Sequence, residues 1–354
     1  MPRDKSDRNE TRDKGYRYAL ETLRERMGIV IPLFLPVQKD TPDVRTLIED
    51  NVLSFVRETS NPGAVCLSVD GTGPARKIGE QLAERHGVRL LHSEQNRGKL
   101  SALRLGALRL LGEGRYDYIG AVDQDGDHFA NELLNFIRAS EHVRALTGSE
   151  RVLVLGRRQS RHHPLGFQRG ELEALADQVL LDALHYDAAR GVEPLDLRFT
   201  SPIDPCPDFH SGYKVFSRKA AEETFGPEPD TAGLPEDACY RHAVEAVLCV
   251  EALKTGALLV EINRSTIDEQ PVSVFADFDR TRLVADKILW PCRRLDIPAR
   301  YVARWIDNHL PSLLLRTLSP EGKKECLDIR RRVFQGMGME TGTETNAILR
   351  PPFL

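Results

Sequence analysis

The sequence predicts an α/β fold with a mostly parallel central sheet, helices on both faces of that sheet, and a helical C-terminal extension. The first observation behind this prediction is that short apolar runs alternate four times with longer amphipathic stretches between residues 28 and 122. Such alternation is typical of a doubly wound parallel sheet. The second observation is that the pattern from residue 272 onward is helical, with interruptions near Pro291, Pro298 and Pro311.

The first half of the chain contains four predicted strands and three predicted helices. The strands are expected at residues 29–37, 64–69, 88–92 and 116–122. The helices are expected at residues 42–56, 76–85 and 99–111, where apolar residues recur at helical spacing. Polar residues follow each strand. Because ligands of such sheets bind beyond the carboxyl ends of the strands, a site is expected at that edge.

The second half continues the pattern and completes the predicted domain organisation. Further strands are expected at residues 152–156, 213–216 and 257–262, and helices at 171–189 and 235–253. We therefore divide the chain into a charged N-terminal segment (1–27), a core domain (28–270) and a helical extension (271–354). The helical stripe at 299–318 is expected to pack into a core. A membrane-surface helix, or a homodimer contact through the C-terminal helices, remains an alternative for it.

Composition excludes several classes of protein. The 49 basic and 53 acidic residues leave a net charge of −4, so nothing indicates a nucleic acid as partner. The 6 cysteines form no Cys-x-x-Cys pair, which argues against a zinc ribbon or a disulfide scaffold. Residues 1–27 contain no apolar signal-peptide core, and the longest apolar run, 29–37, is too short to span a membrane. The expected location is the cytoplasm, with peripheral membrane contact as an option.

Three aspartates at alternate positions follow the fourth predicted strand, at Asp123, Asp125 and Asp127. Crowded carboxylates are costly unless a cation or water neutralises them. A calcium loop of the EF-hand type is excluded, because its sixth and twelfth positions would hold His128 and Leu134 instead of glycine and glutamate. A phosphatase of the haloacid dehalogenase type is disfavoured, because four strands precede the motif. A solvated acidic turn and an Asp-x-Asp metal motif remain open.

Six segments in order resemble the family 2 glycosyltransferases, which have the Rossmann-like GT-A fold. The segments lie at residues 36–40, 68–72, 95–103, 123–125, 210–218 and 235–237. The match is closest at 95–103, where Asn96-Arg97-Gly98-Lys99 is similar to the family's Asn-x-Gly-Lys sequence. The resemblance covers roughly residues 28–265 and leaves the C-terminal extension outside it.

The resemblance implies a donor site for a nucleotide sugar at the strand ends. The residues implied to bind the donor are Pro36, Val37, Asp40, Asp70, Arg97, Lys99, Asp123, Gln124 and Asp125. Asp123 and Asp125 are implied to hold Mg²⁺ or Mn²⁺ against the diphosphate, with His210 as a further candidate ligand. Alternatives stay open for single residues. Asp70 could be a turn residue, Asp127 is more simply a solvated carboxylate, and a lone His210 is more often structural.

The resemblance also implies a general base and an acceptor side. Asp237 is implied to deprotonate the acceptor hydroxyl, with Glu236 as its substitute, and the alternative is a first-turn acid that stabilises its helix. The residues implied on the acceptor or diphosphate side are Ser211, Gly212, Tyr213, Arg157 and Arg158. The basic stretch 157–169 could equally be a solvated, flexible connection.

The expected activity is metal-dependent transfer of a hexose from a nucleotide sugar to an acceptor hydroxyl, with inversion. A UDP-sugar is favoured over a GDP-sugar, and the acceptor is a small molecule, a glycan or a peripheral lipid. A sugar nucleotidyltransferase is the first alternative, although residues 36–40 lack the glycine-rich loop of that class. A non-catalytic nucleotide-sugar-binding protein is the second.

Overall fold

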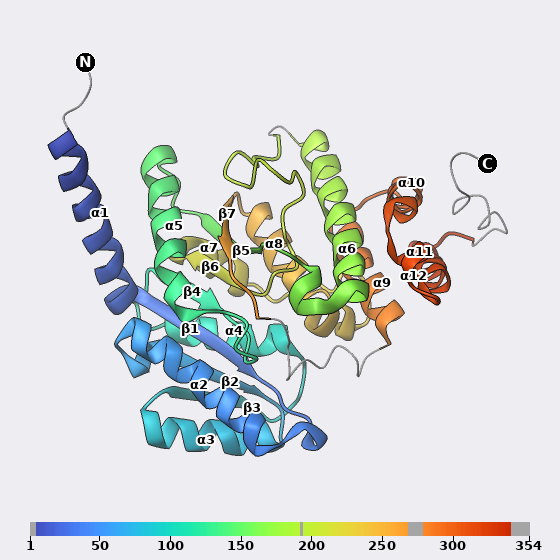
Figure 1. The fold of residues 1–354 in the computed structure, drawn as a ribbon. Helices are drawn as coiled ribbons and strands as arrows, with labels where there is room; N and C mark the ends of the chain where they lie inside the picture. Colours follow the sequence, from blue (N-terminus) through green and yellow to red (C-terminus); the bar gives the residue numbers. More distant parts are fainter. Residues whose placement is uncertain (1–4, 192–193, 268–278, 341–354) are drawn as a thin grey trace.

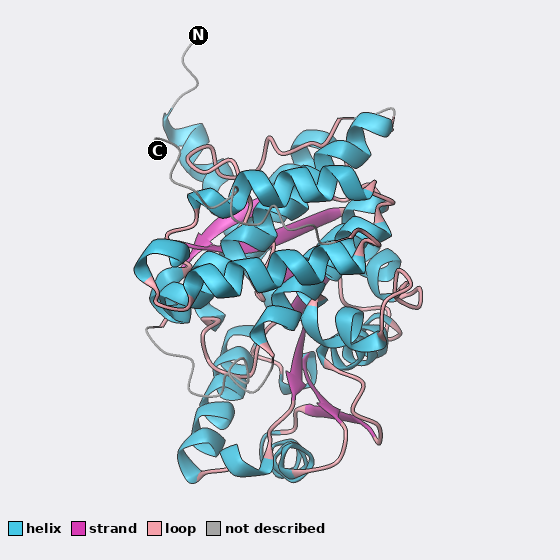
Figure 2. Cartoon of the chain, turned by 90° about the vertical axis from the view of Figure 1, so that its right-hand side faces the viewer, coloured by secondary structure: helices cyan, strands magenta, loops and turns pink. Residues whose placement is uncertain are grey.

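A seven-stranded sheet runs through the middle of the computed structural model, which describes residues 5–191, 194–267 and 279–340 (Figures 1 and 2). The strands are β1 (Met27–Leu33), β2 (Val65–Asp70), β3 (Arg89–Ser93), β4 (Tyr118–Ala121), β5 (Val152–Arg158), β6 (Lys214–Ser217) and β7 (Leu258–Arg264). Their order is β3-β2-β1-β4-β6-β5-β7. Strand β6 runs antiparallel to β4 and β5, and the other pairs are parallel. The predicted α/β class with a mostly parallel sheet is confirmed.

Helices cover both faces of the sheet (Figure 2). The described helices of the N-terminal half are α1 (Lys5–Arg26), α2 (Pro42–Thr59), α3 (Pro74–His86), α4 (Lys99–Leu111) and α5 (Leu133–Thr147). Those that follow are α6 (His162–Arg190), α7 (Arg218–Phe225), α8 (Val244–Lys254), α9 (Arg280–Arg294), α10 (Ala299–His309), α11 (Leu315–Leu318) and α12 (Gly322–Gly336). No described helix is long and apolar enough to cross a membrane.

Strand β1 shows why the sheet is buried on both faces. Its seven residues are all buried, as expected for a parallel strand with helices above and below. Side chains alternate along it, so Val30 belongs to one apolar cluster while Ile29 and Ile31 belong to the other. One cluster includes α4, α6 and α8, and the other includes α2, α3 and α5.

The N-terminal segment differs from its expected description. Residues 5–26 form α1, which lies along α5 (Figure 1). Ala19 and Leu23 are buried in the same cluster as α2 and α5. Two apolar residues four positions apart lie on one side of a helix, and this pair was hidden in a strongly charged sequence. Ala19 and Leu23 are therefore part of the core.

The C-terminal helices are also part of the core. Trp290 of α9, Val302 of α10 and Val333 of α12 belong to the same apolar cluster as Leu175 of α6. The predicted helical extension is confirmed, and its stripe at 299–318 packs inward through Ile306 and its neighbours. The predicted boundary at residue 270 lies outside the described residues, and the homodimer contact stays a prediction.

Several element boundaries differ from the prediction. Strand β1 ends at Leu33 instead of continuing to residue 37, and α6 begins nine residues early, at His162, with a non-helical Gly166 inside it. The helix expected at 235–253 is broken into a π-helical turn, η4 (Ala238–His242), and α8. Such turns are frequent at functional sites.

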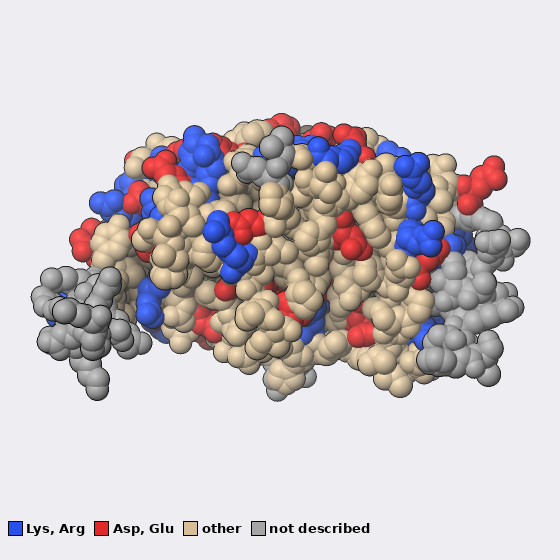
Figure 3. Space-filling model, turned by 90° about the horizontal axis from the view of Figure 1, so that it is seen from above, with Lys and Arg blue, Asp and Glu red and all other residues tan. Residues whose placement is uncertain are grey.

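Charged side chains of both signs are interspersed over the face seen from above in Figure 3. The view fits the balanced composition of 49 basic and 53 acidic residues.

Candidate active site at the carboxyl edge of the sheet

Asp70, the last residue of β2, holds the loop that precedes α4. Its Oδ1 accepts a hydrogen bond from the Arg97 backbone N–H at 3.0 Å, and its Oδ2 accepts one from the Gly98 N–H at 2.7 Å. Burial raises the pKa of Asp70 and outweighs these two bonds, which favour the charged form. Gly98 has φ of +118°, and a Cβ there would lie 2.4 Å from the Tyr240 carbonyl oxygen. Asp70 and Gly98 together place the Arg97-Gly98-Lys99 segment beside η4.

Lys99 connects the aspartate motif to α8. Its Nζ lies 2.6 Å from Asp123 Oδ1 and 2.8 Å from Glu245 Oε1. Burial works against all three charges, but their mutual attraction outweighs it. The pKa of Lys99 is raised, that of Asp123 is lowered, and that of Glu245 is lowered to about 2. All three groups are therefore charged at neutral pH, and one cation sits between two anions.

The backbone of Asp123 is held from both sides by side chains. Its N–H donates to His128 Nδ1 at 2.9 Å, and its carbonyl oxygen accepts from Asn51 Nδ2 at 2.9 Å. Burial, together with nearby cations such as Arg264, holds the pKa of His128 well below its usual range, so the ring is neutral. Its proton is then on Nε2, which lies 3.8 Å from Asp123 Oδ2. The Tyr213 ring stacks on the His128 ring, with 4.7 Å between the two centroids.

Asp125 is a buried carboxylate under electrostatic strain. Burial and the negative charges of Asp123 and Asp127 raise its pKa to about 6. Its Oδ1 accepts a single hydrogen bond, from the Asp127 N–H at 3.2 Å. No described residue donates to its Oδ2. Asp125 is therefore available to an incoming cation.

Gly212, two residues before β6, lies against the Asp123 side chain of the aspartate motif. A Cβ at this position would lie 2.4 Å from Asp123 Oδ2 and 3.1 Å from His128 Cε1. Only glycine allows so close an approach. Gly212 thus lies directly against the Asp123 carboxylate, and its contact with a diphosphate stays a prediction.

If the protein has the metal-dependent donor hydrolysis that the sequence resemblance implies, a Gly212→Ala substitution is expected to leave the fold intact and to reduce that activity about 100-fold, because the new methyl group displaces Asp123. The measurement is nucleoside diphosphate release, with circular dichroism to verify folding. Gly15→Ala is the matched control, since a Cβ at Gly15 meets nothing within 4 Å. Equal activity of the two variants would show that the close approach of Gly212 to Asp123 is not needed for activity.

Asp127 is a structural residue, and the expectation of a solvated carboxylate is wrong. It is buried and forms an ion pair with Arg264, whose Nη1 and Nη2 both lie 3.1 Å from Asp127 Oδ2. Its Oδ1 accepts from the Ile267 N–H at 2.9 Å. This pair fastens the loop after β4 to the end of β7. Sequence reasoning missed it because the partner lies 137 residues away.

Removing Arg264 is expected to destabilise the protein strongly. Arg264→Met leaves Asp127 buried without its partner, which costs about 3–5 kcal/mol of the free energy of unfolding. Arg198→Met is the control, because its pair with Asp196 is 64% and 32% exposed and is worth about 0.2–1 kcal/mol. Urea unfolding measures both losses. Similar losses in the two variants would contradict a structural role for the Asp127–Arg264 pair.

The two predicted base residues lie beside the Arg97 loop. Arg97 Nη2 is 3.3 Å from Glu236 Oε1. Asp237 Oδ1 accepts from Arg241 Nε at 3.0 Å, and its Oδ2 lies 3.6 Å from Arg282 Nη2. The Asp237 side chain is 49% exposed, so a substrate can reach it. The structure thus brings residues 236–237 to the same edge as Asp70 and Lys99.

The predicted metal set of Asp123, Asp125 and His210 is not assembled. Among the residues that the structure describes, no three His, Cys, Asp or Glu side chains form a group that could hold a metal ion. His210 is buried against α6, where its Nδ1 lies 2.7 Å from Asp177 Oδ1. Its buried Nε2 has no hydrogen-bond partner among the described residues. Only the two aspartates remain as metal candidates.

Most of the predicted acceptor-side residues make internal contacts. Of the two interpretations left open for residues 157–169, the solvated, flexible connection is wrong, because the segment belongs largely to β5 and α6. Arg158 is buried, with bonds to Asp208 at 2.8 and 2.6 Å and to Glu173 at 2.9 Å. Arg157 Nη2 donates to Asp204 at 2.5 Å. Arg157 and Arg158 are the last two residues of β5. Their guanidinium groups are paired with carboxylates of the protein and do not extend into solvent.

Ser211 and Tyr213 are also buried and satisfied. Ser211 Oγ donates to the Gly156 carbonyl oxygen at 2.6 Å, and the Tyr213 hydroxyl donates to that of Phe129 at 3.2 Å. Burial raises the pKa of Tyr213. Both hydroxyls are thus occupied by backbone carbonyl oxygens, whereas a Cβ at Gly212 would meet the Asp123 carboxylate.

The residues after β1 shape the rim of the site. Asp40 forms a two-bond ion pair with Arg45 at 2.6 and 2.7 Å, and this partner lowers its pKa. Val37 is 75% exposed and Pro36 is half-buried, so both are open to a ligand. The Gln124 amide pairs with the backbone of Phe34 at 3.0 and 2.6 Å. Asp40 and Gln124 therefore fix the rim, and their predicted contacts with a donor stay predictions.

No protein-family model matches the chain, and no curated protein matches it. Solved structures with a similar fold include a mycobacterial protein, with 19% identity, 79% of this chain and 78% of that chain covered, and a TM-score of 0.46. The mannosyltransferase PcManGT from Pyrobaculum calidifontis, solved with GDP-Man and Mn²⁺, shares 13% identity over 94% and 84% of the two chains, with a TM-score of 0.45. S. aureus TarS 1-349 shares 11% identity over 88% and 89%, with a TM-score of 0.39. At these scores the similarities carry no argument about function.

Proposed function

We propose that the protein is a glycosyltransferase that binds a nucleotide-sugar donor at the carboxyl edge of its sheet. One observation carries the proposal: contacts link segments from distant parts of the chain at that edge. Asp70 holds the Arg97–Gly98 backbone, Lys99 bridges Asp123 to Glu245, and Gly212 abuts Asp123. These are segments whose order in the sequence resembles that of family 2 glycosyltransferases.

The residues present fit a divalent cation. Asp123 and Asp125 are close enough for the charge of Asp123 to act on Asp125, and Asp125 Oδ2 accepts no hydrogen bond from the described residues. Mg²⁺ and Mn²⁺ accept one or two carboxylates and complete their shell with phosphate oxygens and water. Such an ion supplies neutralisation of the negative charge that develops on a departing nucleoside diphosphate.

Each side chain of the site then has a proposed role in binding the donor. Asp123 and Asp125 hold the diphosphate end of the donor, and the Lys99 ammonium keeps Asp123 charged and in place. Arg97, which lies 4.6 Å over the Tyr240 ring, offers a guanidinium to a phosphate or a base. Pro36 and Val37 are open at the nucleoside end. We propose a UDP-sugar over a GDP-sugar on the strength of the sequence resemblance.

Asp237 is the proposed general base. It is half-exposed, lies on the same edge as Arg97, and precedes the π-helical turn η4. Its carboxylate removes the proton from an acceptor hydroxyl, and the oxygen attacks the anomeric carbon opposite the leaving diphosphate. Attack from that side inverts the configuration. The acceptor is a small molecule, a glycan or a peripheral lipid, and the proposed location is cytoplasmic.

A panel of nucleotide sugars tests the proposal through release of nucleoside diphosphate in the presence of Mn²⁺. Hydrolysis of one donor well above the others, and its loss in the Asp125→Asn variant, supports a transferase. Tight donor binding without any hydrolysis or transfer would favour the non-catalytic alternative. Release of pyrophosphate from a sugar phosphate and a nucleoside triphosphate would favour a nucleotidyltransferase.

A further inference from the structure

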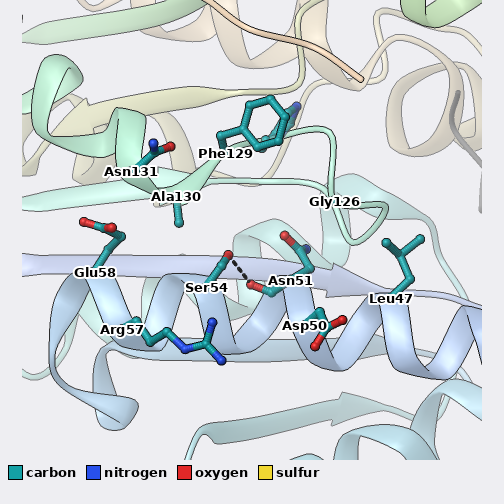
Figure 4. A pocket seen from close by; sticks show the side chains of 11 residues that line it. Leu47, Asp50, Asn51, Ser54, Arg57, Glu58, Gly126, Phe129, Ala130 and Asn131 are labelled. Carbon is teal, nitrogen blue, oxygen red and sulfur yellow. Dashed lines mark hydrogen bonds between the residues drawn. The ribbon is translucent and has the colours of Figure 1, made fainter. Parts of the chain in front are cut away.

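A groove of about 360 Å³ lies between α2 and the loop that follows the aspartate motif (Figure 4). Its lining residues come from two segments: Leu47, Asp50, Asn51, Ser54, Arg57 and Glu58 of α2, and Gly126, His128, Phe129, Ala130 and Asn131. None of these residues is among the site residues predicted from the sequence, although His128 and Asn51 form hydrogen bonds with the backbone of Asp123. The volume falls within the range of small-molecule sites.

The residues that line the groove are spread along α2 from Leu47 to Glu58. Leu47, Ser54 and Glu58 recur at helical spacing along it, and the eleven steps from Leu47 to Glu58 correspond to about 16 Å of helix. Figure 4 shows Glu58 and Asn131 at one end and Leu47 beside Gly126 at the other. A ligand of this site is therefore extended, with polar groups along its length.

Four polar side chains of the groove lack a partner among the described residues. Among the described residues, none forms a hydrogen bond or an ion pair with the side chains of Asp50, Arg57, Glu58 or Asn131. Two carboxylates, one guanidinium and an amide thus face solvent together, beside the half-buried Phe129 ring. A row of such groups with no internal partner can make its hydrogen bonds with a ligand.

The groove carries both negative and positive side chains, and this mixture indicates which class of ligand it can bind. A polyanion would meet the carboxylates of Asp50 and Glu58, and a polycation would meet Arg57. A neutral, hydroxyl-rich molecule suits all three, because each hydroxyl both donates to a carboxylate and accepts from a guanidinium or an amide. The apolar face of a sugar ring can also pack on Phe129 and Leu47.

We propose that this groove binds a neutral di- or trisaccharide at a site separate from the donor site. The groove and the donor site share a wall. Asn51 and His128 line the groove, and these two side chains hold the carbonyl oxygen and the N–H of Asp123. An occupied groove therefore restrains the backbone of Asp123. The binding itself does not rest on the proposed transferase activity.

The test uses the full-length protein and three linear trisaccharides: maltotriose, cellotriose and chitotriose. Hydrogen exchange at 47–58 and 126–131 is measured with each, and saturation-transfer NMR reports binding to the sugar protons. We expect one trisaccharide to protect both segments. A double variant, Glu58→Gln with Asn131→Ala, should weaken that binding about tenfold or more. The matched control on α3, Gln81→Ala with Glu84→Gln, should bind like the wild type.

The outcomes separate the possibilities. Protection by none of the trisaccharides, or equal binding by the Glu58/Asn131 variant, would overturn the proposal. Protection by spermidine or inorganic pyrophosphate in place of the sugars would overturn it as well. If a trisaccharide binds, its elongation in the presence of a donor identifies it as an acceptor. A bound sugar that is recovered unchanged is an effector of the enzyme.

Discussion

An Asp125→Asn variant is expected to be more stable than the wild type at pH 7 and to lose 10²–10³-fold or more of its transfer activity. Burial and neighbouring negative charges raise the pKa of Asp125 from 3.8 to about 6, so the ionised form that is present at pH 7 opposes folding. Removing the charge recovers up to about 3 kcal/mol of the free energy of unfolding. The same change removes a proposed metal ligand, and this accounts for the lost activity.

The destabilisation caused by the ionised Asp125 carboxylate should appear as a loss of stability when the pH rises. The folded pKa of Asp125 lies above the unfolded value, so its stabilising contribution is fully present below about pH 4 and is lost as the pH rises through about 6. Urea unfolding from pH 4 to 7 should show this loss in the wild type and not in Asp125→Asn. Glu84→Gln, an exposed control on α3, should follow the wild type. A variant that is less stable at pH 7 would contradict the strained carboxylate.

An Asp237→Asn variant is expected to bind the donor normally and to lose about 10²–10⁴-fold in transfer, because its amide cannot accept the acceptor's proton. Its side chain is half-exposed, and its ion pairs with Arg241 and Arg282 lie at the surface, so little stability should be lost. The measurements are donor affinity by calorimetry and transfer rate by product formation.

Glu236→Gln is the matched control for the base. Glu236 is 66% exposed and contacts Arg97, so this variant should change donor affinity more than the rate at saturating donor. Full transfer by Asp237→Asn, with transfer lost in Glu236→Gln, would assign the base to the neighbouring residue. Full transfer by both would remove this segment from the chemistry.

The fold and the position of the site follow from local patterns in the sequence. Continuous apolar runs predicted strands such as β1 and β2, and amphipathic spacing predicted α2 and α4 almost to the residue. The rule that ligands bind at strand ends then placed Asp70 and Asp123 on one edge. These features depend only on residues that are close in sequence.

Pairings between distant residues could not be predicted. Lys99 pairs with Glu245 as well as with Asp123, and Asp127 pairs with Arg264; Glu245 and Arg264 lie more than 130 positions from their partners Lys99 and Asp127. Arg158 was taken for a residue that contacts solvent or substrate because its partners, Glu173 and Asp208, carried no local signal. Likewise, charges in the N-terminal segment concealed Ala19 and Leu23, whose burial depends on α5 being present to receive them.

Calorimetric titration of nucleoside diphosphates with and without Mn²⁺ tests the central claim most directly. The claim is that Asp125, together with Asp123, which Lys99, His128 and Asn51 hold in place, forms a metal-assisted diphosphate site. We predict binding to the wild type that strengthens at least tenfold with Mn²⁺, by about 1.4 kcal/mol or more, and a loss of this gain in Asp125→Asn. Equally tight binding without metal, unchanged in Asp125→Asn, would contradict it.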